Sequence, residues 1–133
     1  MAEKRKIRVG IADDEIHIRM LMKKVFQSMN CDIAGEAKNG TEAVDLYKRE
    51  QPEMMFLDIN MPIKTGIDAL KEIISEFPDA FVVMLTSVSD MESIEECIEA
   101  GAANYIRKDT PISELKEIVK ETWGMMKKRG SDA

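Results

Sequence analysis

The chain has 133 residues and a net charge of −6, with 44% hydrophobic and 33% charged residues. These values are ordinary for one soluble globular domain, which we expect to cover residues 1–133. The net negative charge argues against a nucleic-acid-binding domain, which would carry a basic stripe. No apolar run approaches the roughly 18 residues of a membrane span. No apolar stretch follows the charged N-terminus, so we expect no signal peptide, no membrane insertion and a cytoplasmic location.

Short apolar runs alternate with stretches of helical apolar spacing, which predicts a parallel sheet with crossover helices. The first expected strand covers residues 7–12. Apolar residues then recur at helical spacing from Ile18 to Met29, and Asn30 ends that helix. The second expected strand covers residues 31–37.

The second helix and the loop after the third strand carry clear boundary signals. Asn39 is expected to cap the helix, with Glu42 as its capping-box partner. The third apolar run covers residues 54–57 and leads into a loop. Pro62 and Gly66 interrupt that loop, so we expect the third helix to begin after them.

The fourth strand is expected at residues 81–85. A second capping box, from Ser89 to Glu92, predicts the start of the fourth helix, which Gly101 ends. The apolar stripe of this helix is narrower than those of the other helices, and its members are Met91, Ile94, Cys97 and Ile98. Cys31 and Cys97 have no paired ligand, so we expect both to be reduced residues that lie in the core or are half-buried.

The last strand covers residues 104–106, and the fifth helix follows it. Thr110 is the expected cap and Pro111 the first helical position. Residues 130–133 are expected to fray, so the core of the domain spans about residues 5–127 between short flexible tails. The inner face of this helix is Leu115, Ile118, Val119, Thr122 and Met126.

Polar residues suited to phosphoryl chemistry follow four of the apolar runs. In chain order they are Asp13 and Asp14, then Asp58, Thr86 and Lys108. The carboxyl ends of neighbouring parallel strands meet at one edge of a sheet, where open α/β sheets bind their ligands. We therefore expect three carboxylates, a hydroxyl and an ammonium group in one crevice.

Three neighbouring aspartates repel one another, by roughly 4 kcal/mol for a pair about 4 Å apart at an effective dielectric near 20. The cluster therefore needs a bound cation or a protonated acid. Oxygen ligands, without a set of histidines and cysteines, suit Mg²⁺ better than zinc. Lys108 adds a positive charge and Thr86 a hydroxyl for a phosphoryl oxygen. Asp58, at the end of a central strand, is the candidate nucleophile.

Each of these residues also has an ordinary structural explanation. Asp13 or Asp14 alone is most simply a helix cap. Asp58 alone is a turn former, and Lys108 alone is a surface residue. The order and spacing of the whole set, at the ends of four strands, favour a functional site.

The chain also resembles the receiver domains of two-component response regulators, over residues 5–127. The resemblance implies a stand-alone signalling protein of the chemotaxis-regulator type, and not an enzyme with a separate substrate. It implies a flavodoxin-like, doubly wound α/β fold with a five-stranded parallel sheet of order 2-1-3-4-5 and helices on both faces. The matching segments are Asp13-Asp14, Asp58-x-Asn60-Met61-Pro62-x-x-x-Gly66, Thr86-Ser87, Gly101-Ala102-x-x-Tyr105 and Lys108.

The resemblance implies a chemical role for each residue of the site. Asp58 would accept a phosphoryl group from a phosphohistidine of a sensor histidine kinase or phosphotransfer protein. Asp14, Asp58 and the backbone carbonyl of Asn60 would ligate Mg²⁺, and Asp13 would act on the metal through water.

The resemblance also implies a switch. Thr86 would move toward the phosphoryl group, and Tyr105 would swing inward behind it. The fourth helix, fifth strand and fifth helix would then present a changed face to a downstream protein, in a monomer or a phosphorylation-dependent dimer. Asp109 follows Lys108 where the family usually has proline, which leaves open how Lys108 reaches the phosphoryl group. Val88 offers no group to orient a hydrolytic water, which predicts slow self-dephosphorylation.

Three other interpretations fit the sequence less well. A Mg²⁺-dependent phosphatase with an aspartyl nucleophile carries Asp-x-Asp-x-Thr after its first strand, which residues 13–16 do not match. A flavodoxin-type carrier needs a Ser/Thr/Gly-rich phosphate loop there, where this chain has acids. The complete set of acids argues against a receiver that has lost phosphorylation and survives as a docking module.

Overall fold

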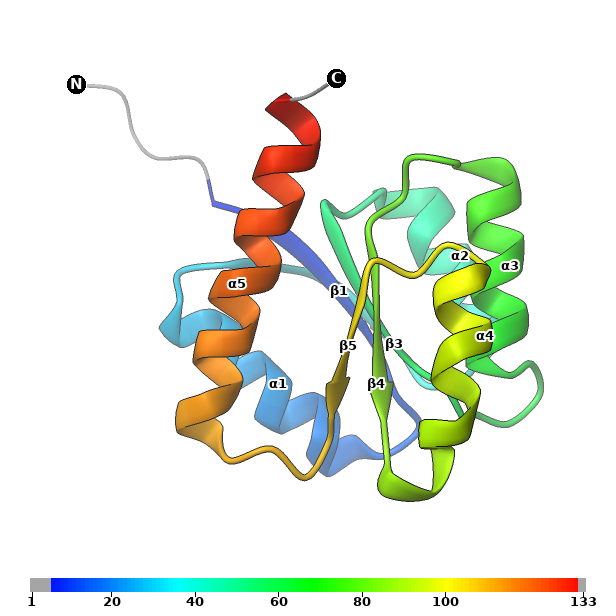
Figure 1. Ribbon diagram of the computed structural model, residues 1–133, viewed down its shortest axis with the longest axis horizontal. Coiled ribbons are helices and arrows are strands. Elements are labelled where there is room, and N and C mark those ends of the chain that lie inside the picture. Colours follow the sequence, from blue (N-terminus) through cyan, green and yellow to red (C-terminus); the bar gives the residue numbers. More distant parts are fainter. Residues whose placement is uncertain (1–5, 132–133) are drawn as a thin grey trace.

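The structure, a computed structural model, describes residues 6–131, and within that range five parallel strands form one sheet (Figure 1). The strand order is β2-β1-β3-β4-β5, which confirms the order that the resemblance implied. The strands are β1 (Arg8–Ala12), β2 (Asp32–Ala37), β3 (Met54–Asp58), β4 (Val82–Thr86) and β5 (Asn104–Arg107).

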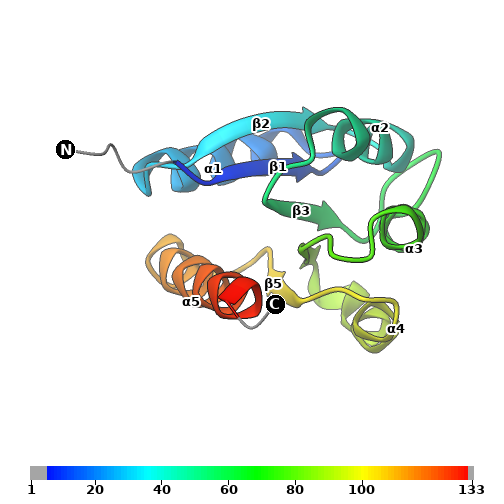
Figure 2. The same cartoon turned by 90° about the horizontal axis from the view of Figure 1, so that it is seen from above.

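Helices cover both faces of the sheet, as predicted (Figure 2). Helices α1 and α5 pack on one face, and α2, α3 and α4 pack on the other. The helices are α1 (Ile16–Ser28), α2 (Gly40–Glu50), α3 (Gly66–Glu76), α4 (Ile94–Glu99) and α5 (Ile112–Ser131). Among residues 6–131, no helix combines the length and the apolar content that crossing a membrane requires.

Strands β3 and β4 are buried along their whole length, because helices cover the sheet on both sides. Side chains alternate between the two faces. Met54 and Phe56 contact the core beside α1 and α5, while Met55 and Leu57 contact the core beside α2, α3 and α4. The two predicted core cysteines are both buried. The polar residues of the site lie at the carboxyl end of this packed sheet.

The end signals of the first two helices are confirmed. Asn30 has φ +62°, a backbone conformation that asparagine tolerates after a helix. The Asn39 side chain accepts a hydrogen bond of 2.8 Å from the Glu42 N–H, which is the predicted cap of α2. The Glu42 carboxylate reaches back to the Lys38 N–H at 3.2 Å and completes a variant of the capping box.

The predicted start of the fourth helix is wrong. A 3-10 helix occupies Val88–Ser93, and α4 begins only at Ile94. The Ser87 hydroxyl donates to the Asp90 carboxylate at 2.9 Å, so these short polar side chains bond to each other instead of capping an α-helix. The apolar stripe shifts accordingly, because Cys97 is buried whereas Ile98 is 44% exposed.

Both ends of the fifth helix also differ from the prediction. The helix begins at Ile112, and the Pro111 carbonyl accepts its first hydrogen bond from the Leu115 N–H at 2.9 Å. Its C-terminal end continues to Ser131 instead of fraying from residue 130. Lysine and arginine in the last turn favour this extension because they complement the helix dipole. Residues 1–5 and 132–133, which belong to the predicted tails, lie outside the described residues.

Gly66 fixes the loop that follows β3. A Cβ atom at this position would overlap the backbone carbonyl oxygen of Asp58, so no larger residue fits without moving the strand end. The Gly66 N–H also donates to the Ile59 carbonyl at 2.8 Å. The loop is therefore folded tightly against the end of β3, next to the candidate nucleophile.

Candidate phosphoryl and metal site

The structure brings the predicted polar residues together at the carboxyl edge of the sheet. Asp58 ends β3 and pairs in register with Leu85 of β4, and Thr86 pairs with Arg107 of β5. One carboxylate oxygen from each of Asp13, Asp14 and Asp58 lies within 4.8 Å of the others. The crevice expected from the sequence is therefore present.

Lys108 lies among the acids although proline does not follow it. Its Nζ is 2.8 Å from Asp13 Oδ2, 3.0 Å from Asp58 Oδ1 and 3.6 Å from Glu15 Oε1. The Lys108 N–H donates to the Thr86 carbonyl at 2.8 Å, which extends the pairing of β4 and β5 by one residue and aims the side chain inward.

The neighbouring acids also set the charge of Lys108. Burial lowers the pKa of the ammonium group, but the hydrogen bonds and charges of Asp13 and Asp58 outweigh burial and leave this pKa raised. Asp109 takes no part in this cluster and forms a 2.7 Å ion pair with Arg107 at the surface. Lys108 is therefore a fixed positive charge in the crevice.

Asp58 is 1% exposed, and its two carboxylate oxygens have different surroundings. Oδ1 faces Lys108 and accepts a long hydrogen bond of 3.4 Å from the Asn60 N–H. Oδ2 is buried and finds no hydrogen-bond partner among residues 6–131. Burial, and next the charge of Asp13, raise the pKa of Asp58 from 3.8 to about 7 despite the opposing effect of Lys108.

Asp13 is fully buried and is not a simple helix cap. Its Oδ1 accepts a hydrogen bond of 2.9 Å from the Glu15 N–H, within the loop, while Oδ2 faces Lys108. The N-cap position of α1 is Glu15, whose side chain makes no capping bond. Asp14 is exposed, so its carboxylate lies at the solvent side of the cluster. The capping explanation for the acidic pair is therefore wrong.

The donor set fits a hard divalent cation. Three carboxylates converge, and the buried Asp58 Oδ2 is left without a partner. A buried carboxylate oxygen without a donor is costly, and a cation would satisfy it. The exposed position of Asp14 leaves room for the water ligands that Mg²⁺ retains.

The two predicted switch residues lie on adjacent strands. Thr86 is fully buried, and its hydroxyl donates to the Ser87 carbonyl at 3.0 Å. Tyr105 pairs with Met84, which contacts the core beside α4. Because side chains alternate along a strand, Thr86 and Tyr105 both face the α4 side of the sheet. Tyr105 is 38% exposed, so its ring is turned outward here.

Two further residues of the site were not identified from the sequence. Glu15 was noted only as the end of an acidic run, yet it is a third acid near Lys108. Arg19 donates to the backbone carbonyl of Asp13 at 2.7 Å. A basic residue on a surface helix carries no pattern that indicates such a contact, so no sequence signal could have found it.

The family model of the response regulator receiver domain matches residues 9–120 of this chain. The chain therefore belongs to the response regulator receiver family, whose members are signalling proteins of two-component systems. The class of fold and the acidic site described above agree with this assignment, and they confirm the resemblance found in the sequence.

Two individual proteins are similar to this chain over most of their length. Protein CcdB of Bacillus subtilis is 37% identical over 117 residues, which cover 88% of this chain and 98% of that protein. Chemotaxis protein CheY of Thermotoga maritima is 38% identical over 110 residues, which cover 83% of this chain and 92% of that protein.

Solved structures are similar as well. The response regulator domain of Thermotoga maritima CheB has a TM-score of 0.82 at 30% identity, covering 92% of this chain and 98% of its own. The complex of CheX, CheY, BeF3 and Mg²⁺ from Borrelia burgdorferi matches with a TM-score of 0.82 at 27% identity, covering 88% of this chain and 89% of that chain.

Proposed function

We propose that this receiver acts in the cytoplasm and accepts a phosphoryl group onto Asp58 from a phosphohistidine of a sensor kinase or phosphotransfer protein. The observation that carries the proposal is the asymmetry of the Asp58 carboxylate. Lys108 and the Asn60 N–H hold Oδ1, whereas the buried Oδ2 has no partner among residues 6–131. Oδ2 is therefore left to the cation, and Oδ1, beside Lys108, is the oxygen that would attack phosphorus.

The chemistry is one transfer step. An Asp58 oxygen forms a bond to phosphorus as the bond between phosphorus and the histidine nitrogen breaks, and the imidazole leaves with the electron pair. Lys108 neutralises negative charge on the phosphoryl oxygens, and the Thr86 hydroxyl turns from the Ser87 carbonyl to donate to one of them. These contacts are the protein's contribution to the reaction.

Asp14, Asp58 and the Asn60 carbonyl would hold Mg²⁺, and Asp13 would act on it through water. Mg²⁺ bound there supplies charge that orients and neutralises the phosphoryl group. Support comes from the converging carboxylates and the unpartnered Asp58 oxygen. The Borrelia burgdorferi relative, solved with Mg²⁺ and BeF3, is consistent with the same arrangement.

Mass spectrometry after incubation with acetyl phosphate and Mg²⁺ tests the acceptor. We expect one added phosphoryl group that is stable to acid and labile to base. Asp58→Asn should lose the label completely, because it removes the attacking oxygen. Asp45→Asn, an exposed residue of α2, is the matched control and should be labelled like the parent. Full labelling of the Asp58→Asn variant would show that another residue is the acceptor.

We further propose that phosphorylation changes a surface made by α4, β5 and α5, which binds a downstream protein. The Thr86 hydroxyl leaves the Ser87 carbonyl to reach the phosphoryl group. The Tyr105 ring then turns inward into the space that the Thr86 side chain has left. Coupling of this kind is a population shift between two states. A hollow of about 330 Å³ beside Tyr105 is one feature of that surface, and its lining includes Asn104, Arg107, Ile118 and Glu121.

Backbone NMR shifts with and without BeF3⁻, a phosphoryl mimic, test the switch. We expect changes to concentrate between Ser87 and Lys108 and to continue into α5, because short α4 and its 3-10 segment are the least regular cover of the sheet. In a Thr86→Val variant, which keeps the side-chain shape, the changes at Tyr105 should be lost. Changes confined to the loops of Asp14 and Asp58 in the parent would contradict the switch.

A further inference from the structure

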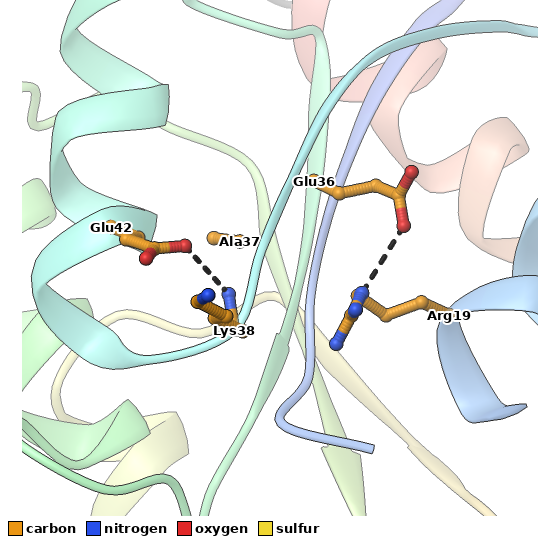
Figure 3. A pocket seen from close by; sticks show the side chains of 5 residues that line it. All are labelled: Arg19, Glu36, Ala37, Lys38 and Glu42. Carbon is orange, nitrogen blue, oxygen red and sulfur yellow. Dashed lines mark hydrogen bonds and ion pairs between the residues drawn. The ribbon is translucent and has the colours of Figure 1, made fainter. Parts of the chain in front are cut away.

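Arg19 of α1 contacts the backbone of the acidic loop, although it belongs to neither the metal ligands nor the phosphoryl contacts. Its side chain is 14% exposed. Nη1 donates to the Asp13 carbonyl oxygen at 2.7 Å. Nε donates to Glu36 Oε1 at 3.1 Å (Figure 3). One guanidinium group therefore links the end of β2 to the loop after β1.

The Asp13 carbonyl is part of the peptide unit that joins Asp13 to Asp14. A peptide unit is planar, so a hydrogen bond that fixes its oxygen also fixes the direction in which the Asp14 nitrogen and Cα leave. The preceding peptide is held as well, because the Asp13 N–H donates to the Ala37 carbonyl at 3.0 Å. Asp14 is exposed, so no surrounding core packing sets the position of its carboxylate.

The position of Arg19 depends on Glu36. Glu36 also accepts a hydrogen bond of 2.9 Å from Lys23, and this bond, with the charges of Lys23 and Arg19, holds the pKa of Glu36 below its usual range. Glu36 thus remains an anion beside the guanidinium. Arg19 and Glu36 line an open polar hollow of about 270 Å³ together with Ala37, Lys38 and Glu42 (Figure 3). The two hydrogen bonds set the guanidinium's position beside this hollow.

We propose that Arg19 is a positioning residue, which holds the peptide between Asp13 and Asp14 so that the Asp14 carboxylate points into the cation site. The expected change in Mg²⁺ affinity rests on the proposed function, which places a Mg²⁺ ion at Asp14 and Asp58. Residues that orient metal ligands typically change metal affinity about tenfold or more when they are replaced. The guanidinium bonds to the Asp13 carbonyl and to Glu36 at the same time through its planar group of donors, which a lysine does not reproduce.

Isothermal titration with Mg²⁺ tests the effect on affinity. Arg19→Gln should raise the Kd by about tenfold, and Arg19→Lys should lose most of the affinity although it keeps the charge. Lys24→Gln is the matched control, since it removes one exposed positive charge from the same helix, and its Kd should equal the parent's. Parent-like affinity in Arg19→Lys would mean that charge, and not position, is what Arg19 supplies.

A second readout needs no metal. In ¹⁵N spectra of the metal-free proteins, Arg19→Gln should shift the Asp14 amide resonance, while the melting temperature and the Lys24→Gln spectrum stay close to the parent's. Should Arg19→Gln fail to fold, Arg19→Lys serves for the same comparison. The positioning role is overturned if the Asp14 amide of Arg19→Gln is unchanged, or if the parent binds Mg²⁺ and the variant has the same Kd. If the Asp14 amide shifts in the variant but the parent binds no Mg²⁺, only the metal site is overturned.

Discussion

Asp58→Asn should stabilise the metal-free protein, and by more as the pH rises. In the parent, Asp58 is buried beside Asp13, and its pKa is raised to about 7. Asparagine keeps the shape of the side chain and carries no charge. Lys108 is not orphaned by the change, because Asp13 Oδ2 remains 2.8 Å from its Nζ. The variant therefore removes the repulsion between Asp13 and Asp58 and leaves the ion pair of Lys108 with Asp13 in place.

The pH dependence follows from the direction of this shift. A carboxyl with a raised pKa in the folded state stabilises the protein while it is protonated, and this contribution is lost as the pH rises through the folded pKa. The variant and the parent should therefore be similar in stability near pH 4 and diverge up to about pH 7. With Asp58 shifted from 3.8 to about 7, the difference approaches about 4 kcal/mol as an upper bound, at 1.36 kcal/mol per pKa unit.

Urea unfolding between pH 4 and pH 8, with a chelator present, measures this difference. Mg²⁺ added at pH 8 should stabilise the parent much more than the variant, because binding to the folded state adds stability by mass action. Asp45→Asn should follow the parent at every pH, since Asp45 is exposed. A difference between Asp58→Asn and the parent that does not vary with pH would contradict the raised pKa of Asp58.

Lys108→Met should have the opposite effect on stability. Methionine fills a similar volume but leaves two buried carboxylates, Asp13 and Asp58, without a facing cation. Removing one partner of a buried ion pair typically costs about 3–5 kcal/mol. We expect a loss of about 3 kcal/mol at pH 8 without divalent cations, and a smaller loss at pH 5, where Asp58 is protonated.

Urea unfolding at the two pH values checks this loss, and Mg²⁺ titration checks its cause. Mg²⁺ should bind more tightly to Lys108→Met than to the parent, because a competing positive charge has gone from the crevice. Lys71→Met, which breaks an exposed 3.0 Å pair with Glu96, is the matched control and should unfold like the parent. Equal losses for the two lysine variants would mean that Lys108 acts as an ordinary surface residue.

The sequence determined which segments form the strands because its patterns report burial directly, whereas the strand order was implied by the resemblance to receiver domains. The wholly apolar runs of β3 and β4 predicted strands covered on both faces, and both are buried throughout. A polar residue directly after a strand lies at the carboxyl edge whatever the loops do. Asp13, Asp58, Thr86 and Lys108 could therefore be placed in one crevice from the sequence.

Local hydrogen bonding was harder to predict than topology. The capping box at Asn39 formed, and its side chain accepts a hydrogen bond from the Glu42 N–H. The similar pattern at Ser89 did not, because Ser87 and Asp90 bond to each other and a 3-10 helix results. Both segments carry a capping residue followed three positions later by glutamate, so that pattern alone does not distinguish them, and the competition among neighbouring partners does.

Only the tertiary structure decided how the site residues are held and charged. The unequal surroundings of the two Asp58 oxygens depend on Lys108 and Asn60, which reach the carboxylate from different strand ends. The contact of Arg19 with the Asp13 carbonyl joins a helix surface to a strand end. Such contacts depend on where individual atoms of neighbouring elements lie in space, whereas residue patterns record only what each segment buries.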